Sequence, residues 1–135
     1  MREAVNLINP SELELQILKV LWEQSPLTAR QIRDHLDERG RRLAYTSVIT
    51  TVQRMVDKKQ LKQLDPTEGK AFRFEPRVSD QQVTRGMLGE FVDRVFDGSA
   101  EAVVLSLFDA TELDEETVKR LRKAFNQKLR ELSNE

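Results

Sequence analysis

The sequence predicts a mainly α-helical fold with one small β-hairpin. Three observations support this fold class. Apolar residues recur at helical spacing along most of the chain, their period changes to two between residues 61 and 74, and clusters of turn residues separate the segments. The 135 residues are enough for one compact domain or for two small units that share an interface.

Three helices are expected before residue 60, and their ends are marked in the sequence. Ser11 and Glu14 have the spacing of a capping box, in which each side chain bonds to the other residue's backbone N–H, so the first helix begins there. Thr28 opens the second helix in the same way, and Gly40 is the glycine expected just beyond its end. The third helix extends over about residues 45–59. Its apolar stripe consists of Val48, Val52, Met55 and Val56.

The third helix is followed by a predicted β-hairpin. Residues 61–64 and 71–74 alternate as strands do, and turn residues lie between them. Beyond Ser79 the pattern predicts three further helices. Three helices followed by a hairpin wing is the order of a winged helix-turn-helix domain, whose third helix enters the DNA major groove. We therefore expect a winged helix DNA-binding domain at residues 1–78 and a helical dimerisation domain at residues 79–135.

The composition excludes several classes of protein. The chain has no Cys and a single His, His35, so disulfide frameworks, thiolate zinc sites and multi-histidine metal sites are excluded. It has no nucleotide-binding or hydrolase motif, so we expect neither an enzyme nor a bound metal or cofactor. It also has no apolar run long enough to span a bilayer and no signal-peptide core, so we expect a cytoplasmic protein without a membrane partner.

Charge is unevenly distributed along the chain. The 22 basic residues nearly balance the 23 acidic ones, yet seven basic residues and one acidic residue lie between Arg39 and Lys62. This concentration around the predicted third helix indicates a local anionic partner. A solvated face on a charge-rich protein would give the same pattern, so charge alone leaves both interpretations open.

The polar side of the third helix carries short hydroxyl side chains. Thr46, Thr50 and Arg54 are four residues apart and share one face, with Ser47 and Thr51 on an adjoining row. Such hydroxyls let a helix approach DNA closely and bond to base edges or phosphate oxygens. We expect Thr46, Ser47 and Thr50 at base edges. The alternative is that the first two only cap the helix and occupy its exposed first turn.

Cations before and after the third helix suit the two phosphate walls of a groove. Lys70 and Arg73 could equally be ordinary polar residues of a half-exposed hairpin, and Tyr45 could be a half-buried anchor. The residues that we expect at the DNA backbone are Tyr45, Thr51, Arg54, Arg41, Arg42, Lys58, Lys70 and Arg73.

The C-terminal part contains more apolar residues than three short helices can bury. A twofold dimer is the commonest way to cover such a surface, and packing against the N-terminal domain is the alternative. The residues that we expect at the dimer interface are Leu88, Phe91, Val95, Val104, Leu107, Phe108, Leu121, Phe125 and Leu129.

Residues 43–59 resemble the recognition-helix signature of the penicillinase repressor (BlaI/MecI-type) family, and residues 14–22 and 72–76 resemble its first helix and wing. The similarity covers about residues 9–132. The resemblance implies a homodimeric transcriptional repressor on a double-stranded DNA operator with dyad symmetry. It also implies that Thr46, Ser47 and Thr50 contact bases and that Arg54 occupies a basic position of the family's motif. A winged helix that binds only proteins is the alternative.

The resemblance also bears on regulation. In the penicillinase systems of this family, cleavage at an Asn-Phe pair in the C-terminal region inactivates the repressor. The corresponding pair here is Ser106-Leu107, which argues against a sensor protease as a partner. Copper-responsive relatives use a cysteine-based metal site, which a chain without Cys cannot form.

Overall fold

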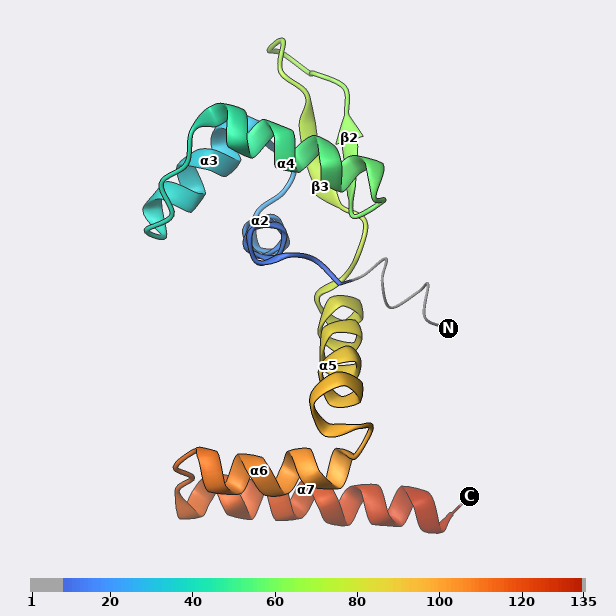
Figure 1. The fold of residues 1–135 in the computed structure, drawn as a ribbon. Helices are drawn as coiled ribbons and strands as arrows, with labels where there is room; N and C mark the ends of the chain where they lie inside the picture. Colours follow the sequence, from blue (N-terminus) through green and yellow to red (C-terminus); the bar gives the residue numbers. More distant parts are fainter. Residues whose placement is uncertain (1–8, 135) are drawn as a thin grey trace. The chain divides into compact units, whose positions relative to one another are not determined.

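The computed structural model describes residues 9–134 and contains two compact units. The first unit ends at Phe91 and the second begins at Val92, within the helix that covers Asp80–Phe96 (Figure 1). The predicted domain boundary, after residue 78, lies before this helix. The predicted fold class, mainly α-helical with a small hairpin wing, is confirmed. The helices and strands of the first unit are α2 (Glu12–Glu23), β1 (Leu27–Thr28), α3 (Ala29–Glu38), α4 (Tyr45–Asp57), β2 (Leu61–Leu64) and β3 (Arg73–Pro76), and α5 (Asp80–Phe96) continues into the second.

The helix ends follow from the capping residues. At the start of α2, the backbone N–H of Ser11 donates to Glu14 Oε1 at 2.9 Å, and the N–H of Glu14 donates to Ser11 Oγ. Thr28 and Gln31 form the second capping box, at the start of α3. Gly40 has a φ of 85°, a left-handed conformation that glycine adopts without steric cost. Both predicted capping boxes and the expected glycine after α3 are therefore present.

The sheet has three antiparallel strands in the order β1-β3-β2. The two-residue strand β1 was not expected, because it is too short to show an alternating pattern. The prediction also placed the second hairpin strand at residues 71–74, whereas β3 covers Arg73–Pro76. Pairing of Leu61 with Pro76 and of Leu64 with Arg73 sets this register. Phe74 is therefore buried in the sheet, whereas Phe72 lies before the strand and is 46% exposed.

The core of the first unit lies between the three helices and the sheet. Ile17, Leu21, Ile32, Val48 and Phe74 are among its fully or almost fully buried residues, so each of the three helices and the wing contributes to one core. Burial of a side chain of this size stabilises the fold by roughly 1.5–3 kcal/mol. The position of α4 is therefore set by the same packing that holds the unit together.

The second unit contains the end of α5 together with α6 (Ala100–Ala110) and α7 (Glu115–Ser133), which lie alongside each other (Figure 1). Side chains cap both helices, since Ser99 Oγ accepts from the N–H of Ala102 and Asp114 Oδ1 accepts from that of Thr117. Neither α6 nor α7 has a buried residue. No helix within residues 9–134 has both the length and the apolar character needed to cross a membrane.

Candidate nucleic-acid interface

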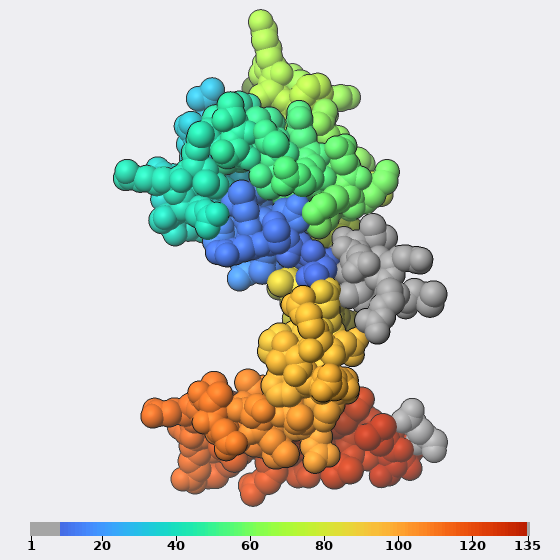
Figure 2. Space-filling model, in the orientation of Figure 1, coloured from blue at the N-terminus to red at the C-terminus, as the bar shows by residue number. Residues whose placement is uncertain are grey.

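Helix α4 divides into a buried and an exposed face. Val48, Val52 and Met55 are fully buried in the core. Figure 2 shows α4, in green, as open surface of the first unit beside the yellow-green wing. The exposed residues of α4 include Tyr45, Thr46, Ser47, Thr50, Gln53 and Arg54. The three residues predicted at base edges are thus together on an accessible helix face.

The start of α4 shows whether the first two hydroxyls cap the helix. The N-cap residue is Ala44, and no side chain donates or accepts a capping hydrogen bond there. Thr46 and Ser47 therefore do not cap the helix. They occupy its exposed first turn, and their hydroxyls are available to a partner molecule.

Thr51 does not belong to this exposed face, which corrects its expected place at a phosphate. Its side chain is only 8% exposed, and its hydroxyl donates to the carbonyl oxygen of Ser47 at 2.9 Å. A threonine inside a helix commonly satisfies its hydroxyl in this way, at the carbonyl four residues earlier. Thr50 and Thr51 are neighbours in sequence, but the helix turns one outward and the other inward.

The predicted phosphate-binding cations differ in their intramolecular partners. Arg54 and Lys70 are exposed and form no ion pair within residues 9–134. Arg41 lies 3.7 Å from a carboxylate oxygen of Glu12, and Arg42 Nε lies 3.3 Å from Asp37 Oδ1. Such exposed pairs are weak and can exchange for a phosphate. Arg73 is directed to its own hairpin, where Nη2 donates to the carbonyl oxygen of Asp65.

Lys58 has a stronger internal partner than the other cations. Its Nζ donates to both carboxylate oxygens of Glu14, at 2.9 and 3.2 Å, and Glu14 is only 1% exposed. Lys58 therefore links the end of α4 to the start of α2, and its side chain is 46% exposed. This link fixes the C-terminal end of the exposed helix.

Competing effects act on the pKa of Glu14. Burial raises the pKa of this carboxyl, but the backbone N–H of Ser11, the ammonium of Lys58 and the side chain of Gln60 together outweigh burial and lower it below its ordinary value. Glu14 is therefore ionised at neutral pH and holds three groups from different parts of the first unit.

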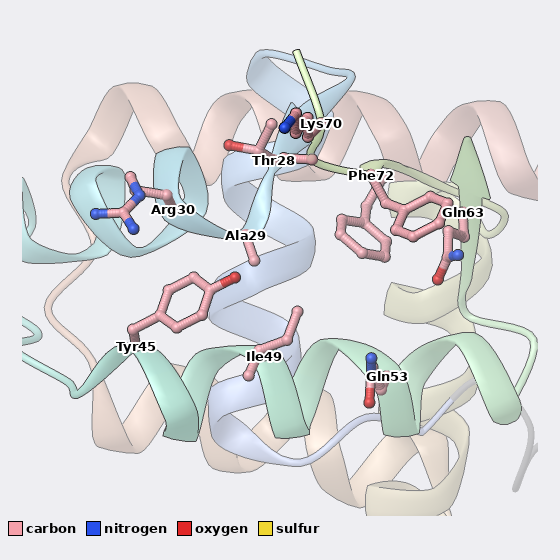
Figure 3. Close-up of a pocket in the computed structure, with 11 residues that line it drawn as sticks. Thr28, Ala29, Arg30, Tyr45, Ile49, Gln53, Gln63, Lys70 and Phe72 are labelled. Atoms are coloured by element: carbon pink, nitrogen blue, oxygen red, sulfur yellow. The ribbon is translucent and has the colours of Figure 1, made fainter. Parts of the chain in front are cut away.

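A cleft of about 350 Å³ lies between α4 and the wing. Tyr45, Ile49 and Gln53 line it from α4, and Gln63, Lys70 and Phe72 line it from the wing (Figure 3). Arg30, at the start of α3, forms a further part of its wall. The guanidinium carbon of Arg30 lies 5.5 Å from the centroid of the Tyr45 ring, a cation–π distance.

Arg30, Gln53 and Gln63 were absent from the sequence-based site. Arg30 lies outside the basic stretch around α4, and the fold brings it to Tyr45 from a different helix. Gln53 and Gln63 are uncharged, so the distribution of charge along the chain could not indicate them. The exposed helical position of Gln53, three residues after Thr50, was the one signal that could have included it. No group of three or more His, Asp or Glu residues suited to a metal ion occurs in the described part of the chain.

The chain is similar to known proteins over most of its length. The family model described as penicillinase repressor matches residues 10–127. The transcriptional regulator BlaI of Mycobacterium tuberculosis is 29% identical over 106 residues, which cover 77% of this chain and 75% of that protein. The penicillinase repressor of Bacillus licheniformis is 22% identical over 111 residues, which cover 82% of this chain and 84% of that protein. The chain therefore belongs to the penicillinase repressor family, whose members are DNA-binding regulators of transcription and not enzymes.

Proposed function

We propose that this protein is a homodimeric transcriptional repressor that reads a dyad-symmetric DNA operator with α4. The exposed hydroxyl face of Thr46, Ser47 and Thr50 carries the proposal, because none of these side chains is needed to cap or pack the helix. Hydroxyls at the surface of a helix can bond to base edges, and a threonine methyl can contact the methyl group of thymine. Family membership supports the repressor function, and the base-reading residues are our inference.

The second unit supports the homodimer. Its helices α6 and α7 bury no residue, while Leu107, Phe108, Phe125 and Leu129 are exposed. A hollow of about 230 Å³ between them has an almost entirely apolar lining. A monomer rarely leaves such a surface in water, and a self-complementary twofold contact would cover it in both copies. Two recognition helices related by that twofold axis would match two half-sites of one operator.

The salt dependence of operator binding tests the proposal. The logarithm of the binding constant should fall linearly with the logarithm of the salt concentration, by about 0.9 for each phosphate neutralised. Fluorescence anisotropy with a labelled operator at several salt concentrations would measure this slope. An operator found by in vitro selection, with a scrambled duplex as control, supplies the DNA. A flat response would favour a winged helix that binds only proteins, and equal affinity for both duplexes would show DNA binding without sequence preference.

Replacement of Thr50 should affect sequence preference more than affinity for random DNA. Thr50→Ala removes one hydroxyl and one methyl from the exposed face and leaves the buried face of α4 unchanged. We expect a loss of roughly 1–3 kcal/mol on the selected operator, and little change on the scrambled duplex. Equal losses on both duplexes would instead assign Thr50 to the DNA backbone. Thr67→Ala, in the exposed loop before Lys70, is the control.

The proposal includes no protease partner. Ser106 and Leu107 lie inside α6, and the pair differs from the Asn-Phe pair cleaved in penicillinase systems.

A further inference from the structure

We propose that the cleft between α4 and the wing holds the sugar–phosphate backbone of one DNA strand, with Arg30 and Tyr45 binding its phosphates. This inference rests on the proposed function and extends it to a residue, Arg30, that neither the sequence nor the family comparison singled out. The cleft is the one described above, with walls from α3, α4 and the wing (Figure 3).

The position of the cleft follows from the rows of side chains on α4. Tyr45, Ile49 and Gln53 are four residues apart and form the row that lines the cleft. Thr46 and Thr50 form the adjoining row, which faces the bases in the proposed function. When that row is in the major groove, the nearest neighbour on the wing side is the backbone of one strand, because a strand bounds each side of a groove. The backbone would therefore lie along the cleft.

The charge of the cleft suits a phosphate. Arg30 and Lys70 contribute two cations, and none of the described residues that line the cleft carries a carboxylate. A groove with cations and without acids favours an anion over a neutral ligand or a cation. A guanidinium also presents paired N–H donors that match two phosphate oxygens.

Arg30 differs from nearby arginines in how it is held. Arg33 donates to Asp34 at 3.4 Å, and Arg39 forms an ion pair with Glu23 at 3.0 Å, so carboxylates inside the protein hold both guanidinium groups. Arg30 instead lies over the Tyr45 ring, which orients the guanidinium without using its N–H donors. Figure 3 shows the Tyr45 hydroxyl directed into the cleft, where it can donate to a phosphate of the same strand.

The apolar part of the cleft suits a deoxyribose. Phe72 is a large aromatic side chain that is 46% exposed, and it lines the cleft opposite Ile49. An aromatic ring in water gains stability when an apolar surface covers it. The C–H face of a sugar beside the bound phosphate would provide such a surface. Phosphate and sugar recognition together identify a nucleic acid backbone, because free phosphate would leave Phe72 uncovered.

The test compares two arginine variants in the full-length protein. Arg30→Gln should reduce the salt slope of operator binding by about 1.8, which is one phosphate at 0.9 for each of two protomers. Arg39→Gln removes the same charge from the other end of α3, where Glu23 holds it, and should leave the slope unchanged. Arg30→Lys keeps a cation and should retain a slope near that of the unchanged protein. Thermal unfolding of each variant verifies that the fold is intact.

Ethylation interference locates the contact on the DNA. Ethyl groups on individual phosphates of the operator block binding wherever the protein needs the charge. One position per half-site should stop interfering in Arg30→Gln and should still interfere in Arg39→Gln. An unchanged slope and an unchanged ethylation pattern in Arg30→Gln would overturn the inference, as would equal slope changes in both glutamine variants. If the unchanged protein itself showed no operator preference or no salt dependence, the proposed function would fail instead.

Discussion

Phe125→Asp should convert the protein from a dimer to a monomer. Phe125 is 48% exposed in the single chain and lines the apolar hollow between α6 and α7. In the proposed dimer this surface is covered, so the substitution would place one carboxylate from each copy in an apolar contact. An unpaired charge in such a place costs several kcal/mol, and the twofold axis doubles the cost. Sedimentation or light scattering at micromolar concentration would show the change in mass.

Loss of the dimer should also weaken operator binding strongly. Two linked binding domains gain roughly 10²- to 10⁴-fold over one, and a monomer loses that gain. Phe72→Asp is the matched control for mass, because Phe72 is an equally exposed phenylalanine of the first unit. That variant should remain dimeric. A dimeric Phe125→Asp protein would show that the copies associate through another surface or that α6 and α7 pack elsewhere.

Local signals in the sequence predicted much of the first unit. A capping box joins residues three apart, so Ser11 and Thr28 identified the starts of α2 and α3 directly. Helical periodicity identified α4 and the exposed position of Thr50. The two-residue strand β1 could not be recognised, because it exists only through its pairing with β3. Local pattern therefore predicted the helices better than the sheet.

Contacts between residues far apart in the sequence account for the differences between the predicted site and the site in the structure. Lys58 is among the cations near α4 in sequence, but its partner Glu14 lies in another helix, and the sequence does not pair them. Thr51 has the chemistry of Thr50, and only the packing of α4 on the core shows that it points inward. Arg30 reaches Tyr45 because α3 and α4 pack together. Residue type and spacing thus identified candidate DNA-binding residues, and the packing of the helices determines which of them are accessible.

The link between Glu14 and Lys58 leads to the second large expected effect, on the stability of the first unit. Glu14→Ala would remove the N3 side chain of the capping box and leave the Ser11 N–H, Lys58 and Gln60 without their shared partner. We expect a loss of about 2–4 kcal/mol in the free energy of unfolding. Glu14→Gln keeps an acceptor for Ser11 and loses only the charge, so it should lose less. The fluorescence of Trp22, the single tryptophan, reports urea unfolding of this unit.

The pH dependence of the loss identifies the charge as its cause. Because the pKa of Glu14 is lowered in the folded state, its ionisation stabilises the fold above the ordinary value of 4.5. That contribution is lost as the pH falls through the lower, folded-state pKa. The difference in stability between the unchanged protein and Glu14→Gln should therefore be largest near neutral pH and shrink below about pH 4.5. Glu12→Gln, at an exposed position of the same turn, should change stability by less than about 0.5 kcal/mol. A Glu14→Gln difference that stayed constant with pH would show that shape and hydrogen bonding, rather than the charge on Glu14, hold α2 to the end of α4.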